Sequence, residues 1–190
     1  MKKIALTILS ILLCIMVASC GSESELPTSI APSDFSKETE DALEIFADEL
    51  QYYDIVYDDT VKSRSIAVSI YSDGEWVEVG KSYGNVDESS ERIAIQLAGD
   101  SFELYRIEKD GHEKSGYPSL GSGIESATAV GSTRIDEYTE LTIGEETSIW
   151  VKLGNDGSSM AEITLDGDFR EYECDYGIAV TITVSDVSVE

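Results

Sequence analysis

The stretch SIAVSIYSDGEWVEVG, residues 65–80, decides the fold. Aliphatic residues occupy alternate positions on both sides of Asp73-Gly74, a dipeptide typical of two-residue β-hairpin turns. A turn at this dipeptide fixes the register, because each residue of one strand then has a defined partner on the other. The aliphatic side chains share one face in two opposing pairs, Ile70 with Val77 and Val68 with Val79. The stretch therefore predicts an antiparallel hairpin with one face on a hydrophobic core.

Period-two alternation dominates the rest of the chain. Alternate side chains of a β-strand lie on opposite faces, so each such run predicts a half-buried strand. The other runs are RIAIQL (92–97), SIWVKL (148–153) and YECDYGIAVTITV (172–184). Further turn signals are Asp110-Gly111, Asn155-Asp156-Gly157 and Asp166-Gly167. The sequence has no long helical pattern between these runs, so it predicts an all-β fold, an antiparallel β-sandwich or jelly-roll-like single domain, and not parallel βαβ units.

One segment, KETEDALEIFADELQYYDIV (37–56), fits both kinds of secondary structure. Its first part carries a helical stripe, whereas its last part is rich in aromatic and branched residues that favour a strand. The two sets are Leu43, Phe46, Ala47 and Leu50, and Tyr52, Tyr53, Ile55 and Val56. We expect a short helix or strand that enters the β domain.

The N-terminus has the layout of a signal peptide: a basic start, Lys2 and Lys3, and an uncharged apolar run from Ile4 to Ala18. As a helix this run spans about 22 Å at roughly 1.5 Å per residue. The hydrocarbon core of a bilayer is roughly 30 Å thick, so the run is too short for a permanent transmembrane helix. The segment therefore predicts export.

Val17, Ala18, Ser19 and Cys20 resemble the lipobox of bacterial lipoproteins, in which an aliphatic residue and two small residues precede a cysteine. The resemblance implies transfer of diacylglycerol to the Cys20 thiol and cleavage of residues 1–19. Several acyl chains anchor a protein stably, whereas one chain binds a bilayer only marginally. The alternative is an ordinary cleaved secretion signal without lipid. The resemblance thus predicts a protein anchored through Cys20 on the extracytoplasmic face of the cell membrane.

The segment after Cys20, GSESELPTSIAPSDFS (21–36), is rich in serine and contains two of the three prolines. This composition is typical of a flexible tether. We therefore expect residues 20–37 to form the lipidated terminus and linker, and residues 38–190 to form the β-sandwich. A chain of this size can bury about two-thirds of its unfolded surface in one domain.

The sequence is strongly acidic, with 13 Lys and Arg against 38 Asp and Glu and a net charge of −25 at pH 7. Removal of Lys2 and Lys3 with the signal leaves −27. Such a charge repels nucleic acid and anionic lipid head groups. We therefore expect no nucleic-acid partner, and the oligomeric state stays open.

After processing, Cys174 is the only remaining cysteine that is not lipidated, so an intramolecular disulfide is excluded. Cys174 lies on the apolar phase of its run and is expected to be a small buried hydrophobe. His112 is the only histidine, and it lies beside a predicted turn between charged residues, where it is expected to be solvated. These counts exclude a zinc site of cysteine and histidine ligands and a Cys–His nucleophile pair.

Three aromatic residues are the candidate ligand-binding residues. The hairpin register places Tyr71 opposite Trp76 on the polar face of the strands. Trp150 alternates with aliphatic neighbours and shares a predicted face with Ser148 and Lys152, so both tryptophans are expected to face away from the core. Tyr71, Trp76 and Trp150 could form a platform on which sugar rings stack, or mark a protein interface. The alternatives are a cross-strand pair that only stabilises the hairpin, or a pair covered by the N-terminal segment.

The chemistry-bearing residues fit no catalytic or cofactor motif. Acidic clusters are expected by composition in so acidic a chain, and none has the spacing of a calcium-binding EF-hand loop. Asp166 and Asp168 are the best calcium candidates, with a polar turn as the favoured alternative. The segment around Ser122 is a Gly/Ser turn and not a nucleophile elbow. We expect no catalytic residues, no metal and no cofactor.

The whole mature region resembles the small acidic β-rich lipoproteins of Gram-positive bacteria, through its lipobox, tether and patterned strands. The resemblance carries no catalytic motif. Together, these features predict a membrane-anchored extracellular lipoprotein with a non-enzymatic binding domain, with carbohydrate as the sharper form of the ligand hypothesis. The alternatives are a structural accessory subunit of a cell-envelope complex and a carboxylate-dependent glycoside hydrolase, in which two carboxylates would flank a cleft.

Overall fold

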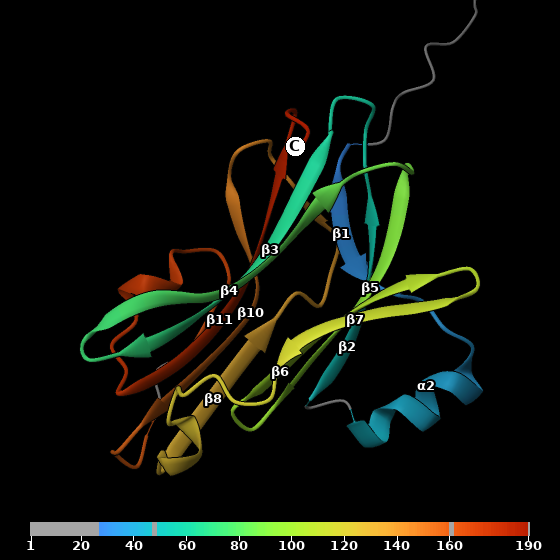
Figure 1. Ribbon diagram of the computed structural model, residues 1–190. Helices are drawn as coiled ribbons and strands as arrows, with labels where there is room; N and C mark the ends of the chain where they lie inside the picture. Colours follow the sequence, from blue (N-terminus) through green and yellow to red (C-terminus); the bar gives the residue numbers. More distant parts are fainter. Residues whose placement is uncertain (1–26, 47–48, 160–161, 190) are drawn as a thin grey trace, which may run out of the picture.

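The computed structural model describes residues 27–46, 49–159 and 162–189. Two antiparallel sheets pack face to face, which confirms the predicted all-β sandwich (Figure 1). The six-stranded sheet has the order β7-β6-β5-β2-β1-β9, with β1 (Ser29–Pro32), β2 (Leu50–Val56), β5 (Ser90–Ala98), β6 (Ser101–Glu108), β7 (Gly111–Tyr117) and β9 (Thr139–Glu140). The five-stranded sheet has the order β4-β3-β11-β10-β8, with β3 (Ser63–Ser72), β4 (Glu75–Asn85), β8 (Ala129–Arg134), β10 (Glu146–Asn155) and β11 (Tyr176–Ser185).

The predicted hairpin is formed by β3 and β4. Asp73 and Gly74 both have positive φ, 54° and 89°, as the favoured two-residue turn of twisted hairpins requires. Ile70 pairs with Val77 as the spacing predicts. The local sequence therefore fixes the turn and the register of the residues beside it.

Farther from the turn, a β-bulge changes the register. Val68 pairs with Gly80, so the predicted pair of Val68 with Val79 is wrong, although Val79 still packs against the core. A Cβ atom built on Gly80 would lie 2.2 Å from the ring of Tyr117 at the end of β7. The bulge thus brings a residue without a side chain to the place where the other sheet approaches β4.

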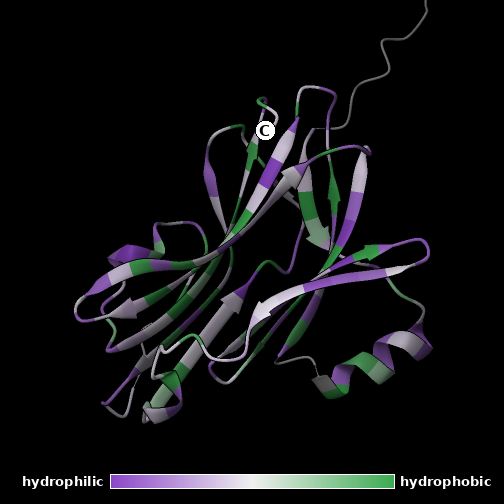
Figure 2. Cartoon of the chain, in the orientation of Figure 1, coloured by the Kyte–Doolittle hydropathy of each residue, from purple (hydrophilic) through white to green (hydrophobic). Residues whose placement is uncertain are grey.

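The main core lies between the two sheets, where the predicted aliphatic faces meet. The hydropathy colouring alternates along the strands accordingly (Figure 2). The confirmed inward residues are Ile66, Val68 and Ile70 on β3, Ile93, Ile95 and Leu97 on β5, and Ile178, Val180, Ile182 and Val184 on β11. A second, smaller cluster of Val151, Leu153, Phe169 and Ala179 lies on the outer face of the five-stranded sheet, under the short 3-10 helix η3 (Phe169–Glu171).

The domain begins earlier than the sequence predicts. Residues 29–32 fall in the expected tether, yet they form β1, an internal strand between β2 and β9, with Ile30 fully buried. Pro32 fits this position because β9 pairs only with Ser29 and Ile30, so no partner on that side needs the missing N–H. The predicted domain boundary at residue 38 is therefore wrong. The reason is that β1 is short and carries only one large apolar residue, so it shows no alternating pattern in the sequence.

The ambiguous segment contains both predicted kinds of structure in succession. Helix α2 (Lys37–Leu43) and the 3-10 helix η1 (Glu44–Phe46) precede β2. Helix α2 lies beside the six-stranded sheet, on the side away from the other sheet, and none of its residues is buried (Figure 1). In the described part of the chain, no helix is long and apolar enough to cross a membrane.

Candidate ligand-binding site

Tyr71 and Trp76 meet as the hairpin register predicts. They pair directly across β3 and β4, with ring centroids 5.7 Å apart and planes at 62°. Edge-to-face contact of this kind stabilises a hairpin beyond simple burial. The pair is on the outer face of the five-stranded sheet, opposite the main core.

The Trp76 ring is used for packing. Its second neighbour is Phe169 of η3, 4.7 Å away between centroids and at 86°. A Cβ atom built on Gly177 would lie 2.4 Å from the indole ring, so Trp76 rests directly on the backbone of β11. The geometry favours the alternative of a covered cross-strand pair, and the cover is η3 rather than the N-terminal segment.

Trp150 does not join Tyr71 and Trp76. It is 1% exposed and belongs to the main core, so the expectation that it faces away from the core with Ser148 and Lys152 is wrong. The cause is a β-bulge between Ser148 and Trp150, which turns Ile149 and Trp150 inward together. The indole nitrogen donates a hydrogen bond of 2.7 Å to Ser132 Oγ.

The bulge also reverses the rest of β10. The sequence pattern predicts that Val151 and Leu153 share a face with Ile149, but they lie in the outer cluster with Phe169. Ile163, Leu165 and η3 therefore cover an apolar patch that the strand pattern assigns to the core. The candidate residues Tyr71, Trp76 and Trp150 consequently do not share one exposed surface.

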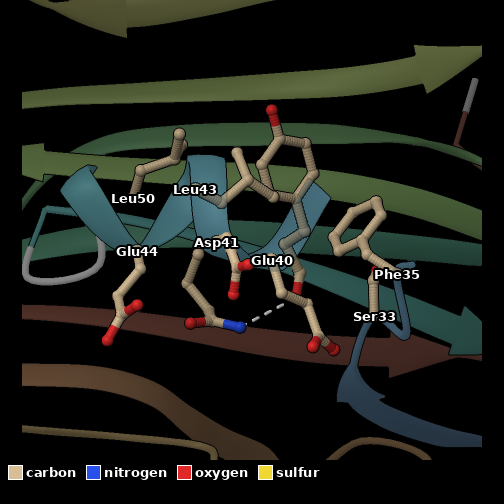
Figure 3. Close-up of a pocket in the computed structure, with 9 residues that line it drawn as sticks. Ser33, Phe35, Glu40, Asp41, Leu43, Glu44 and Leu50 are labelled. Carbon is tan, nitrogen blue, oxygen red and sulfur yellow. Dashed lines mark hydrogen bonds between the residues drawn. The ribbon is translucent and has the colours of Figure 1, made fainter. Parts of the chain in front are cut away.

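A cavity of about 330 Å³ is present on the opposite side of the sandwich, between α2 and β2 (Figure 3). We call it the α2–β2 pocket. Its lining consists of Ser33, Phe35, Glu40, Asp41, Leu43, Glu44, Leu50, Gln51 and Tyr52. The segments involved are the chain after β1, the helical turns and the start of β2, so residues from one continuous stretch of sequence form the pocket.

Local sequence features explain why the wall of the pocket formed by α2 is helical. Ser36 precedes α2 in an extended conformation and its carbonyl accepts the first helical hydrogen bonds. Glu38 and Glu40 lie in the first turn, where carboxylates interact favourably with the helix dipole. Lys37 Nζ and Asp41 Oδ1 form an i,i+4 ion pair of 3.0 Å. Because α2 is short and buries no residue, few contacts hold it against the sheet.

The aromatic wall of the pocket is a pair of rings. Phe35 and Tyr52 contact edge to face, 5.2 Å apart at 84°. The Arg92 guanidinium lies 5.1 Å from the centroid of Phe35, and Asp54 holds this guanidinium with two contacts of 2.6 and 2.8 Å. The hydrogen bonds from Arg92 lower the pKa of the Asp54 carboxyl. This chain of contacts fixes Phe35 at the edge of the pocket.

The opposite rim is acidic. Glu40, Asp41 and Glu44 are exposed carboxylates on consecutive helical turns. Asp41 pairs with Lys37, whereas Glu40 and Glu44 have no ion-pair partner within the described ranges. The pocket therefore combines aromatic and aliphatic walls with exposed carboxylates at its rim.

Few features of the sequence point to this pocket. Phe35 is a single aromatic residue in a Ser- and Pro-rich stretch, and the residues around Tyr52 predict a strand without indicating that Tyr52 lines a pocket. The two cysteines that the sequence singles out differ in whether the structure describes them. Cys20 and residues 17–19 lie outside the described residues. Cys174 is partly buried against the outer cluster, and burial raises the pKa of its thiol to about 11.

The calcium candidates form a turn. Asp168 Oδ1 accepts a hydrogen bond from the Arg170 backbone N–H and pairs with the Arg170 guanidinium at 3.1 Å. Among the residues that the structure describes, no group of three or more His, Cys, Asp and Glu side chains is placed to hold a metal ion. The contacts of Asp168 are those of a structural cap on η3.

Comparisons of this chain with protein-family models, with curated proteins and with solved structures find no match.

Proposed function

We propose that this protein is a lipid-anchored, extracytoplasmic binding module that holds carbohydrate without catalysis, and that the α2–β2 pocket is its ligand site. The observation that carries the proposal is the pairing of ring walls, Phe35 and Tyr52, with a carboxylate rim that includes Glu40 and Glu44. Sugar rings present apolar C–H faces, which aromatic rings cover. Their hydroxyl groups donate hydrogen bonds, which carboxylates accept. A volume of about 330 Å³ is at the lower end of small-ligand sites and suits one or two sugar units.

The proposal is tested with the full-length protein in detergent micelles on a glycan array. Glu44→Gln removes a rim carboxylate, and Glu38→Gln is the matched control because Glu38 lies on α2 outside the pocket lining. Loss of a charge-assisted hydrogen bond is expected to weaken binding about tenfold for Glu44→Gln and to leave Glu38→Gln unchanged. Equal effects of the two variants, or no glycan bound by the parent protein, would contradict the proposal.

A second readout uses the weak attachment of α2. A ligand that bridges the helix and β2 stabilises α2, so amide hydrogen exchange in residues 37–46 should slow when glycan is added. Exchange in β11, on the other sheet, serves as the internal control. An unchanged exchange rate in α2 at saturating glycan would place the ligand elsewhere on the domain.

The lipid anchor is a separate part of the proposal and has its own test. Metabolic labelling with an alkyne fatty acid should label the parent protein and the control variant Cys174→Ser, because Cys174 is partly buried and its thiol pKa is raised. Cys20→Ser should abolish the label and release the protein from the membrane fraction. Persistent labelling of Cys20→Ser would refute lipid attachment at this cysteine.

A subunit of an envelope complex is the second candidate function. The observation that favours it is Ile45 on η1, an apolar side chain that is 80% exposed and follows directly after Glu44 of the pocket lining. Chemical crosslinking in whole cells separates the two functions. One stoichiometric partner lost in Ile45→Ser would favour the subunit, whereas glycan binding that is unaffected by Ile45→Ser would favour the module.

A further inference from the structure

The lining of the α2–β2 pocket has an unbalanced charge. Among the residues that the structure describes, it contains the carboxylates of Glu40, Asp41 and Glu44 and no lysine, arginine or histidine. Asp41 forms an ion pair with Lys37, which lies outside the lining. Glu40 and Glu44 are exposed, and neither forms an ion pair with a described residue. Two negative charges at the pocket therefore have no cationic partner within the described part of the chain.

The two free carboxylates lie on one side of the helix. The Glu44 backbone N–H donates to the Glu40 carbonyl, so the two residues are one α-helical turn apart and their side chains are neighbours. In Figure 3 their carboxyl groups lie on one side of the view, with Leu43 and Leu50 on the other side. Like charges at this spacing repel each other, and no basic residue lies in the last turn of α2, where the helix dipole also favours a cation. A positive charge beside Glu40 and Glu44 would therefore be stabilised by both carboxylates and by the end of the helix.

Arg92, the cation beside the aromatic wall, is already matched by a carboxylate. Its guanidinium lies near the Phe35 ring, and the two oxygens of Asp54 hold it with contacts of 2.6 and 2.8 Å. The other charged residues that flank the pocket in the sequence and are exposed in the structure are the acids Asp34, Glu38 and Glu49. The surroundings of the pocket are therefore negative as well, and a ligand with a positive charge is complementary to them.

We propose that the sugar bound by the α2–β2 pocket carries an ammonium group, which Glu40 and Glu44 hold while the aromatic wall covers the sugar ring. This inference rests on the proposed function and names the ligand class, an amino sugar without an N-acetyl group. An ammonium group adds charge attraction to the hydrogen bond that a neutral hydroxyl donates to a carboxylate. An anionic sugar would meet only like charges in the lining, and the net charge of −25 adds to this repulsion.

The experiment compares four disaccharides by isothermal titration calorimetry, with the full-length protein in nonionic micelles at pH 5.5 and constant ionic strength. The probes are the disaccharide of N-acetylglucosamine, the same disaccharide with one acetyl group removed, the disaccharide of glucose, and a disaccharide of glucose and glucuronic acid. The probe with the free amine should bind at least about tenfold more tightly than the N-acetylated and glucose probes. The glucuronic acid probe should bind most weakly.

Two double variants locate the amine, because the net charge of −25 attracts a cation to any part of the protein. Glu40→Gln with Glu44→Gln removes both free carboxylates of the lining. Glu38→Gln with Glu49→Gln is the matched control, since it removes the same charge from exposed residues outside the lining. The pocket variant should prefer the amine over the N-acetylated probe by less than about threefold, whereas the control should keep the preference of the parent. Thermal unfolding close to that of the parent shows that both variants are folded.

The outcomes separate this inference from the proposed function. Binding of the N-acetylated, glucose or glucuronic acid probe as tightly as the amine would overturn the inference and leave carbohydrate binding in place. An amine preference that survives in the pocket variant, or that both double variants lose equally, would also overturn it. Absence of binding for all four probes would contradict the proposed function, and the inference with it.

Discussion

At the scale of the residue, Glu91 is a largely buried carboxylate that contacts two arginines, Arg64 and Arg106. Burial alone raises the pKa of its carboxyl, but the hydrogen bonds and charge of Arg64 and the hydrogen bond from Tyr57 outweigh burial, and the pKa lies below its usual value of 4.5. Burial, and after it the charge of Glu91, raises the pKa of the Tyr57 hydroxyl. Because Arg64 comes from the facing sheet, Glu91 links the two layers as well as filling the space between them.

Removal of the Glu91 charge is expected to destabilise the fold. Glu91→Gln leaves the buried Arg64 without its anionic partner, which costs about 3 kcal/mol in the free energy of unfolding. Glu88→Gln is the control, since Glu88 is exposed and forms no ion pair within the described residues, and it should change the free energy by less than about 0.5 kcal/mol. Urea denaturation at pH 7 measures both values. A loss below 1 kcal/mol for Glu91→Gln would show that water compensates the arginine.

The pH dependence of stability follows from the same pKa. A carboxyl whose pKa is lower in the folded state contributes stability that is present above its unfolded value of about 4.5 and is lost as the pH falls through the folded pKa. The parent should therefore lose stability more steeply below pH 4.5 than Glu91→Gln does. Denaturation curves at a series of pH values between 3 and 7 test this expectation, and parallel slopes for the two proteins would contradict it.

Gly177 leaves the space that the Trp76 ring occupies on β11. A methyl group at this position meets the Trp76 ring at 2.4 Å and Tyr71 Cβ at 3.1 Å, so Gly177→Ala is expected to displace the indole and to cost about 1–3 kcal/mol. Gly157→Ala is the control, because its Cβ has no neighbour within 4 Å. Thermal unfolding and tryptophan fluorescence report the two effects. Parent-like stability and fluorescence in Gly177→Ala would mean that Trp76 packs loosely and is free for a ligand.

At the scale of the element, the β3–β4 hairpin shows how local sequence sets structure. Its turn requires positive φ at two successive residues, and Gly74 satisfies this at 89° without the strain that a side chain would bring. Two bulges then modify the simple pairing, one in β4 and one in β10. The first leaves Val79 packed against the core while Val77 is 40% exposed. The second reverses which side chains of β10 face the core from Trp150 onward.

The turn makes a specific prediction. Gly74→Ala should lower the free energy of unfolding by about 1–2 kcal/mol, because a residue with a Cβ atom pays the left-handed backbone penalty there. Gly84→Ala, in the same strand, is the matched control: its Cβ has no neighbour within 4 Å and its backbone is extended, so its effect should be within about 0.5 kcal/mol of zero. Chemical denaturation compares them, and equal effects would mean that the turn relaxes to another type.

At the scale of the whole molecule, the net charge affects the stability of the fold. A net charge of −25 repels itself in the compact state, and dissolved salt screens this repulsion. The melting temperature should therefore rise between about 10 and 300 mM sodium chloride, where the screening length shortens from about 30 Å to below 8 Å. Differential scanning calorimetry measures the rise. A falling melting temperature would mean that favourable ion pairs such as Arg92–Asp54 outweigh the general repulsion.

The candidate site was harder to predict than the fold. The sequence pointed to Tyr71 and Trp76 as a pair, and their pairing is confirmed, but it gave no sign of the η3 segment that covers Trp76. It also placed Phe35 in a tether, because β1 carries only one large apolar residue. Whether an aromatic ring is covered or open depends on segments far away in the chain, and no local pattern contains that information.

The sequence by itself determined the period-two strands, the turn at Asp73-Gly74, and the inward faces of β3, β5 and β11. These follow from local rules, since a strand alternates its side chains and an apolar face must leave water. Only the tertiary structure decided that Trp150 is in the core, that residues 29–32 complete a sheet, and that α2 and β2 enclose a pocket. The physical reason is that bulges and coverage are set by contacts between distant segments, which minimise buried polar groups and cavities together.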